Sequence, residues 1–267
     1  MLGFKLAWST ILLIDVIFLF IAGLIGGVLN SIAGGGSFIT FPALVFVGVP
    51  PLMANATNTF SSCAGYFSGA YAFRHKLKEH KKEMLLTILF SLLGGSLGAF
   101  LLLKTPEASF EKVIPWLLLF ATLLFIFGGR ANTLLQSYSE KNKYALQFKS
   151  IFLSLSLLSV CVYGGFFNAG LGIVVLSYLT LSGHKNINVM NGLKLVVSSA
   201  VSIAAILLFV LSDSIAWLEG CIVLVGTLLG GYYSAHISMK LNQQYVRWFV
   251  IFMSAVITVY FFYVTYA

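Results

Sequence analysis

Charged residues are scarce in this chain. Of its 267 residues, 9% are charged and 59% are hydrophobic, whereas about 25% of the residues in a soluble globular protein are charged. The apolar runs follow one another too closely to leave room for a soluble domain. The composition therefore predicts a polytopic membrane protein whose functional groups lie within the bilayer or in short loops.

Groups that carry metal, redox or hydrolytic chemistry are also few. The three cysteines lie singly on separate apolar segments, and the four histidines fall in or beside loops. No CxxC, Cys/His or HExxH spacing predicts a metal or redox site. Neither a GxSxG elbow nor a pair of acids occurs within an apolar run, which argues against a membrane-embedded enzyme. We therefore expect no metal and no cofactor.

The positive charge is confined to a few loops. A net charge of +8 distributed in this way indicates membrane topology and contact with lipid headgroups rather than with nucleic acid. Segment 74–83 holds five of the sixteen basic residues, and the polar segment 130–149 holds four against one acid. By the positive-inside rule, both segments are predicted to be cytoplasmic loops of a plasma (inner) membrane protein.

The chain contains eight long apolar runs and two short ones. The first exceeds the ~7–15 residues of the apolar region in a cleavable signal peptide, so we interpret it as a span. Twelve residues of helix cover about 18 Å, which is less than the ~30 Å hydrocarbon core. The long runs lie near 11–30, 53–73, 84–103, 113–128, 150–168, 190–211, 215–234 and 246–266, and the short ones at 38–49 and 173–182.

The second half of the chain repeats the first at a fixed offset of 136 residues. We therefore predict an all-α integral membrane bundle of two four-span repeats, each with a glycine-rich break and a short helix after its first span. The first repeat covers 1–130, a cytoplasmic linker 131–148, and the second repeat 149–267. The matching pairs are Ala33–Gly36 with Ala169–Gly172, Asn55 with Asn191, and Leu92–Gly95 with Leu228–Gly231.

Each glycine cluster interrupts an apolar run. Irregular backbone at membrane depth is tolerated where it is packed in protein or lines a polar cavity. Consecutive glycines also let N–H groups at the start of the next helix face an anion. Two halves with a break at the same place are typical of secondary transporters, whose site forms near the membrane midplane. The alternative is close helix packing through small residues.

The direction of the short segments decides the topology. If they turn back without crossing, there are eight crossings, with ten basic residues on the cytoplasmic side and six outside. If they complete a crossing, the repeats are inverted and the division becomes thirteen against three. The charges favour inversion, whereas the short length opposes it.

Three motifs resemble the sulfite exporter TauE/SafE family over nearly the whole chain. They are Gly34-Gly35-Gly36-Ser37 followed by Pro42-Ala43-Leu44, the stretch Ala54-Asn55-Ala56-Thr57-Asn58-Thr59, and Asn191-Gly192-Leu193-Lys194. The resemblance implies a secondary transporter, exporter or importer, of small sulfur-containing anions such as sulfite, organosulfonates or sulfoacetate. The second break departs from the pattern because no proline follows it. A passive anion channel, a membrane assembly factor and a membrane-embedded enzyme are the alternatives.

Lys194 is the first candidate for contact with an anionic substrate. It lies within the sixth long run, where a charge costs about 3 kcal/mol or more unless it has a partner or a function. Snorkelling to the headgroups is the alternative. Its repeat counterpart is Asn58, so the predicted site combines a cation, an amide and neutral donors. The candidate residues are Gly34, Gly35, Gly36, Ser37, Asn55, Thr57, Asn58, Ser61, Gly170, Gly172, Asn191 and Lys194.

Carboxylates for ion coupling are nearly absent from the apolar runs. Asp15 and Glu219, both near segment ends, are the candidates for coupling transport to protons or sodium. The sequence predicts neither the coupling ion nor the oligomeric state.

Overall fold

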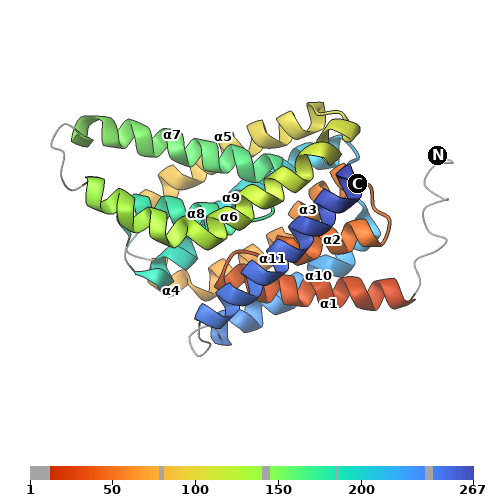
Figure 1. Ribbon diagram of the computed structural model, residues 1–267. Helices are drawn as coiled ribbons and strands as arrows, with labels where there is room; N and C mark the ends of the chain where they lie inside the picture. Colours follow the sequence, from red (N-terminus) through yellow and green to blue (C-terminus); the bar gives the residue numbers. More distant parts are fainter. Residues whose placement is uncertain (1–12, 78–80, 140–144, 185, 238–242) are drawn as a thin grey trace.

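The computed structural model describes residues 13–77, 81–139, 145–184, 186–237 and 243–267 as helices joined by short connections, with no strand in these ranges (Figure 1). The helices are α1 Leu13–Ile32, α2 Ser37–Phe46, α3 Pro51–Ala72, α4 Arg74–Leu77, α5 Lys81–Lys104, α6 Glu107–Ser139, α7 Ala145–Phe166, α8 Leu171–Leu181, α9 Ile187–Leu211, α10 Trp217–Ile237 and α11 Gln243–Tyr266.

Four of these helices are long and apolar enough to cross a membrane, namely Leu13–Ile32, Met84–Lys104, Ile187–Leu211 and Arg247–Tyr266. This confirms the prediction of an all-helical, multi-pass membrane protein. Helix α3 is as long, but it carries a polar run between Asn55 and Ser62 that is buried inside the bundle. The predicted span 113–128 lies within the longer α6, which extends into the predicted linker as far as Ser139, and α7 begins within the same linker at Ala145.

Local sequence explains where the short helices begin and end. Gly48 and Gly183 have φ values of +91° and +105°, which L side chains rarely adopt, and each follows a short helix. Pro51 starts α3 at a position where its missing N–H costs nothing. Asn186 caps α9, since its Oδ1 accepts from the backbone N–H groups of Asn188 and Val189 at 3.0 and 3.4 Å.

Each short helix runs from its break to the end of the bundle at which the preceding helix began, so it completes the return passage rather than ending where that preceding helix ended (Figure 1). In Figure 1 the chain enters α1 and leaves α2 at the right-hand end of the bundle, and it enters α7 and leaves α8 at the left-hand end. We call the right-hand end, where α1 begins and α11 finishes, the terminal end, and the left-hand end, where α4 lies, the linker end. The two hairpins therefore open toward opposite ends of the bundle.

Helix packing in the two halves follows one scheme. Helix α1 packs along α10 as α7 packs along α5, and α3 packs on α10 as α9 packs on α5. Helices α2 and α8 likewise contact α11 and α6. Gly95 lies against Val201, and Gly231 lies against Gly65. These two contacts are equivalent, because Gly231 is the repeat counterpart of Gly95 and Val201 is that of Gly65.

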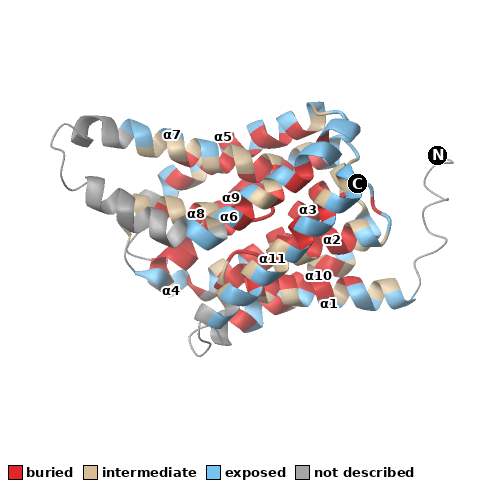
Figure 2. Ribbon diagram, viewed as in Figure 1, coloured by how far each residue is buried: buried red, intermediate tan, exposed pale blue. Residues whose placement is uncertain are grey.

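The apolar core surrounds the region where the two hairpins meet (Figure 2). Phe41 of α2 packs edge-on against Phe167, with ring centroids 5.7 Å apart, and stacks on Phe261 of α11 at the same separation. Phe110, near the start of α6, also contacts Phe167. These rings fill the space between the hairpins and the terminal end, and large exposed apolar side chains cover the outside of the bundle.

The two glycine breaks lie in direct backbone contact. A Cβ added at Gly172 would lie 2.5 Å from the Cα of Gly34, and a Cβ added at Gly34 would lie 2.8 Å from the Cα of Gly172. Gly34 and Gly170 have φ values of +82° and +79°. Any side chain at this crossing would therefore push the two hairpins apart.

The crossing predicts a size-dependent loss of stability at Gly172. Replacing Gly172 with Ala should lower the free energy of unfolding by about 1–3 kcal/mol through overpacking, and Gly172→Leu should lower it further. Gly48 is the control because a Cβ there meets nothing within 4 Å. Gly48→Ala and Gly48→Leu should each cost about 1 kcal/mol of backbone strain, whatever their size. Chemical unfolding in detergent micelles measures both series, and equal size dependence at the two positions would contradict the close crossing.

Candidate functional site

The helix ends that flank the crossing define the electrostatics of the site. Helices α2 and α8 begin at Ser37 and Leu171, directly after the two breaks. Their N-termini carry partial positive charge and backbone N–H groups without partners inside the helix, which favour an anion. The backbone N–H of Gly36 donates to Asn30 Oδ1 at 2.8 Å, which fixes the first break against the end of α1.

Lys194 contacts the carbonyl end of α1, which directly precedes the first glycine break. Its side chain is 0% exposed, and its ammonium donates to the backbone oxygen of Ser31 at 3.3 Å and to Asn191 Oδ1 at 3.2 Å. Both partners are neutral oxygens, although the last turn of α1 carries the negative end of the helix dipole. Among the residues whose burial is described, Lys194 is the one buried charged side chain.

The end of α7 is capped in the corresponding way. Asn55 of α3 donates through Nδ2 to the backbone oxygen of Phe166 at 2.9 Å. Asn55 and Asn191 occupy equivalent positions in the two halves. Each broken helix therefore receives a side-chain donor from the other half of the chain.

Two polar stripes run along the facing helices α3 and α9. Asn58, Ser62 and Tyr66 follow one another at intervals of four residues on α3, and Lys194, Ser198 and Ser202 do so on α9. All six side chains are buried, and each residue of one stripe is the repeat counterpart of one in the other. Residues four apart lie on one face of a helix, so each stripe is a continuous polar surface.

Asn168 joins these stripes to the breaks. Its Oδ1 accepts from Tyr66 OH at 2.7 Å and from Ser37 Oγ at 3.4 Å, and its Nδ2 donates to Ser202 Oγ at 3.4 Å. Asn168 thus connects α3, the start of α2 and α9 in one hydrogen-bonded network. It was not among the predicted site residues, although it stands two residues before the second glycine break.

Several buried polar atoms close to the breaks have no partner in the described part of the chain. Thr40 and Ser62 both donate to Asn58 Oδ1, at 2.5 and 3.4 Å, whereas Asn58 Nδ2 has no partner. Asn30 Nδ2 and Ser198 Oγ are unpaired as well, as is one acceptor, Asn55 Oδ1. Each buried polar group without a partner lowers the stability of the folded protein by about 1–3 kcal/mol. A ligand that accepts hydrogen bonds would satisfy the three donors.

Thr57 and Ser61, which were also predicted, lie on another face of α3. Thr57 Oγ1 accepts from the backbone N–H of Ala216 at 2.9 Å, and Ser61 Oγ donates to the backbone oxygen of Gly220 at 2.9 Å. These bonds attach α3 to α10. The structure therefore brings Asn58 to the stripe between α3 and α9, and places Thr57 and Ser61 in a packing interface.

The two candidate coupling carboxylates lie far from Lys194. Asp15 is in the first turn of α1, whereas the lysine contacts Ser31 in the last turn of that helix. Glu219 is in the first turn of α10 at the same terminal end. Both side chains are partly exposed.

An all-helical membrane bundle in which two discontinuous helices meet at a polar crossing has the architecture of a secondary transporter. Comparison with known sequences agrees. The chain belongs to the sulfite exporter TauE/SafE family, whose pattern matches residues 19–261. No solved structure matches the chain.

Relatives match along almost their whole length. A probable membrane transporter protein of Haemophilus influenzae is 30% identical over 90% of this chain and 91% of its own. The probable membrane transporter protein YfcA of Escherichia coli K12 is 28% identical over 90% of this chain and 87% of its own. The probable membrane transporter protein ORF9 of a Sinorhizobium species is 25% identical, covering 91% and 90%. These names indicate transport rather than enzymatic activity.

The network around Asn168 predicts energetic coupling between α3 and the second break. Tyr66→Phe and Asn168→Ala should each lower the free energy of unfolding by about 1 kcal/mol or more. The double variant should lose about 0.5–3 kcal/mol less free energy of unfolding than the sum of the two single losses, because both substitutions remove the same hydrogen bond. The control pair is Tyr66→Phe with Ser91→Ala, since Ser91 contacts Cys161 instead. Additive effects for Tyr66 and Asn168 in micelle unfolding would contradict the network.

Proposed function

We propose that this protein is a secondary transporter, exporter or importer, of small sulfur-containing anions such as sulfite, organosulfonates or sulfoacetate. The observation that carries the proposal is the crossing at Gly34 and Gly172, where two helices begin. Asn30 and Asn58, each with an unpaired buried Nδ2, are hydrogen-bonded to the first break directly or through Thr40. The family to which the chain belongs supports the sulfur-containing substrate.

The balance of donors and acceptors supports an anion rather than a cation. An oxyanion only accepts hydrogen bonds, so its site must be rich in N–H and O–H groups. Asn30 Nδ2 and Asn58 Nδ2 are unpaired donors and Asn55 Oδ1 is an unpaired acceptor. The unpaired Ser198 hydroxyl can donate to an anion as well as accept. The α2 and α8 dipoles add positive potential at the same place.

Lys194 supplies the compensating charge in this proposal. A buried ammonium paired only with neutral oxygens is unfavourable in a low-dielectric interior, and a bound anion neutralises it. The hydrogen bond to the backbone oxygen of Ser31 places the ammonium beside the last turn of α1. Asn191, one turn before the lysine, moves with it on α9 and keeps its Oδ1 bond to the ammonium.

The proposed transport cycle follows from the two hairpins. We assign them to inverted repeats, residues 1–130 and 149–267, connected by 131–148. Because the hairpins open toward opposite ends, a small rotation of one half against the other exposes the crossing to one side of the membrane at a time. Coupling to protons or sodium through Asp15 or Glu219 would act from the terminal end.

Substitution of Lys194 tests the binding site. With sulfite or sulfoacetate added to the detergent-purified protein, the melting temperature of the parent should rise, because a ligand of the folded state stabilises it. Lys194→Met should weaken apparent binding about tenfold or more, as expected for the loss of a charged hydrogen bond. Lys194→Arg should be less damaging because it keeps the charge. Lys104→Met, at the end of α5, is the control for a lost lysine.

Lys194→Met also removes the cap of α1, so its melting temperature should fall even without ligand. The variants are therefore compared by the rise in melting temperature that the ligand produces in each. An unchanged rise in Lys194→Met would show that the lysine only caps the helix. Transport into liposomes by the parent separates the classes: saturable sulfite flux supports a carrier, and flux that does not saturate supports a channel. If no sulfur oxyanion either stabilises the parent or crosses the liposome membrane, the proposed substrate is wrong.

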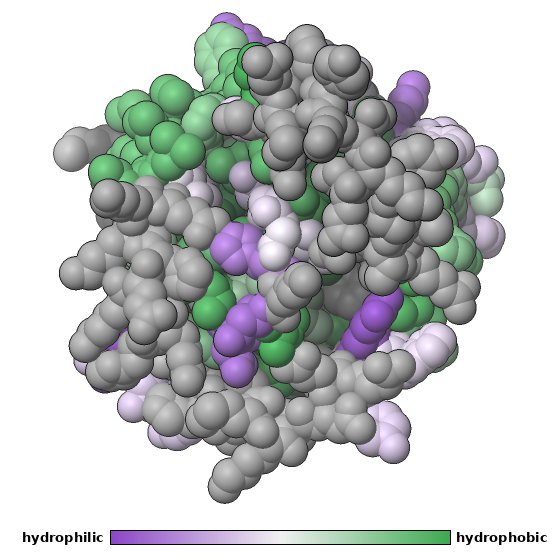
Figure 3. Space-filling view, turned by 90° about the vertical axis from the view of Figure 1, so that its left-hand side faces the viewer, coloured by the Kyte–Doolittle hydropathy of each residue, from purple (hydrophilic) through white to green (hydrophobic). Residues whose placement is uncertain are grey.

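We also propose that the linker end is cytoplasmic. Arg74 and the start of α9 lie at this end, and the view onto it in Figure 3 shows hydrophilic side chains gathered near its centre with apolar ones around them. Apart from the buried Lys194, this assignment places twelve of the sixteen basic residues on the cytoplasmic side and three outside. Residues 78–80 and 140–144 of the predicted cytoplasmic segments lie outside the described residues.

Fusion reporters test this orientation. A reporter that is active only in the cytoplasm should be active when fused after Lys82 and inactive when fused after Ala267, because the basic loop is retained inside. A periplasm-specific reporter should give the reverse pattern. Activity of the cytoplasmic reporter at both positions would instead require an even number of crossings between them and exclude inverted repeats.

A further inference from the structure

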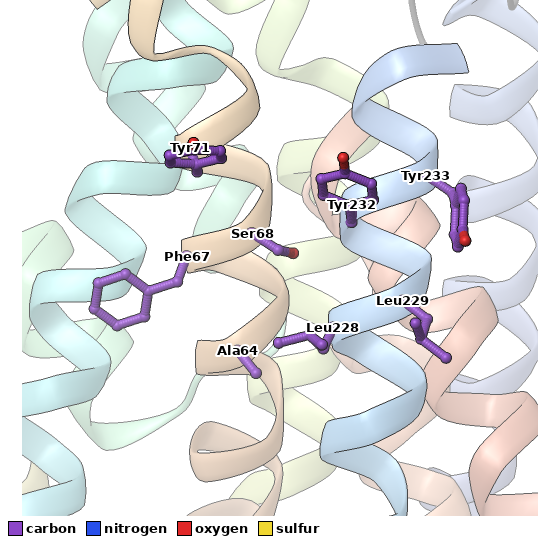
Figure 4. A pocket seen from close by; sticks show the side chains of 8 residues that line it. All are labelled: Ala64, Phe67, Ser68, Tyr71, Leu228, Leu229, Tyr232 and Tyr233. Atoms are coloured by element: carbon purple, nitrogen blue, oxygen red, sulfur yellow. The ribbon is translucent and has the colours of Figure 1, made fainter.

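A groove of about 780 Å³ runs along the outside of the bundle between α3 and α10. Its volume lies in the range of pockets that hold small molecules, about 300–1,000 Å³. Figure 4 shows α3 on one side and α10 on the other, with the side chains of Ser68 and Leu228 between them. The lining residues are Ala64, Phe67, Ser68, Tyr71, Leu228, Leu229, Tyr232 and Tyr233.

The chemistry of the groove changes along its length. Ala64 and Leu228 lie farther from the linker end along α3 and α10, whereas Tyr71 and Tyr232 lie nearer to it (Figure 4). Leu228 is 43% exposed and Tyr71 is 60% exposed, so both face the surroundings of the bundle. Tyrosine is enriched where hydrocarbon meets headgroups, because its ring is apolar and its hydroxyl is polar. The change from apolar residues to tyrosines along the groove therefore matches the change from acyl chains to headgroups across one leaflet of a membrane.

Arg74 lies at the headgroup end of this groove. Its guanidinium stacks over the ring of Tyr71 at 4.0 Å from the centroid, and its Nη1 donates to the backbone oxygen of Tyr71 at 2.9 Å. These contacts hold the cation beside the tyrosine ring at the groove. A guanidinium has five N–H donors in a planar fork that fits a phosphate. The segment that follows adds four more basic residues.

We propose that this groove binds one anionic phospholipid, with an acyl chain between α3 and α10 and the phosphate at Arg74. The apolar lining excludes the groove as a path for a small oxyanion, and the arginine at its end complements an anionic headgroup rather than a second apolar surface. The proposal depends on membrane embedding and not on the transported substrate.

The groove shares its wall with the helices that carry the candidate site. Ser68 lies beside Gly231, and the backbone oxygen of Gly231 accepts from Ser31 Oγ at 3.2 Å. Ser31 is also the residue whose backbone oxygen binds Lys194. A lipid in the groove would therefore pack against α3 and α10, the two helices that also contact α1.

The test compares lipids on the purified protein. Phosphatidylglycerol should raise the melting temperature more than phosphatidylcholine with the same chains at the same concentration. Arg74→Gln should weaken apparent phosphatidylglycerol binding about fivefold, the effect of one basic residue near an anionic headgroup. Lys104→Gln is the matched control, because Lys104 lies over the ring of Phe100 on α5 and away from the groove. It should leave the preference unchanged.

Filling the groove supplies the second arm. Ala64→Phe should reduce stabilisation by both phospholipids, and Leu228→Trp serves if the first variant fails to fold, since Leu228 is exposed. Glycerol phosphate, a headgroup without chains, should have no effect; stabilisation by it equal to that by phosphatidylglycerol would mean a phosphate site without a lipid. Equal effects of the two phospholipids, or of Arg74→Gln and Lys104→Gln, would overturn the proposal. So would dimerisation that protects a cysteine placed at Leu228 from labelling, because a second copy would then cover the groove.

Discussion

The backbone contact between Gly34 and Gly172 is the constraint on which the rest of the structure depends. Because neither residue has a Cβ, two hairpins that enter the bundle from opposite ends can touch at their tips. That contact brings the N-termini of α2 and α8 to one place, and it determines how far each preceding helix can extend. A bundle of uninterrupted helices would have no helix ends at this depth, and hence no backbone donors directed at a common point.

Breaking a helix inside a membrane creates polar groups that lipid cannot satisfy. The structure satisfies them by exchange between the halves: Lys194 of the second half binds the carbonyl end of α1, and Asn55 of the first half binds that of α7. Neither half could satisfy its own break in this way. This exchange explains why polar residues of α3 and α9 are buried deep in an otherwise apolar bundle.

The sequence pattern predicted the helical membrane class, the two breaks and the short helices after them, because glycine clusters and apolar runs are local signals. It did not decide whether the short helices cross, since that depends on the direction in which the chain leaves each break. It also grouped Thr57 and Ser61 with Asn58, although they lie on different faces of α3 and have different neighbours. Asn30, Tyr66, Asn168 and Ser198 were missed, because their significance comes from partners or orphan atoms that only the tertiary packing reveals.

The aromatic packing around Phe41 makes the two ends of the bundle mechanically unequal. Phe41, Phe167 and Phe261 close the space on the terminal side of the crossing, whereas the repeat counterpart of Phe41 is Ser177. Any conformation open toward the terminal end must separate these rings and expose their apolar area, at about 25 cal/mol for each Å². A conformation open toward the terminal end must therefore break aromatic contacts that Ser177, at the equivalent position of α8, cannot make.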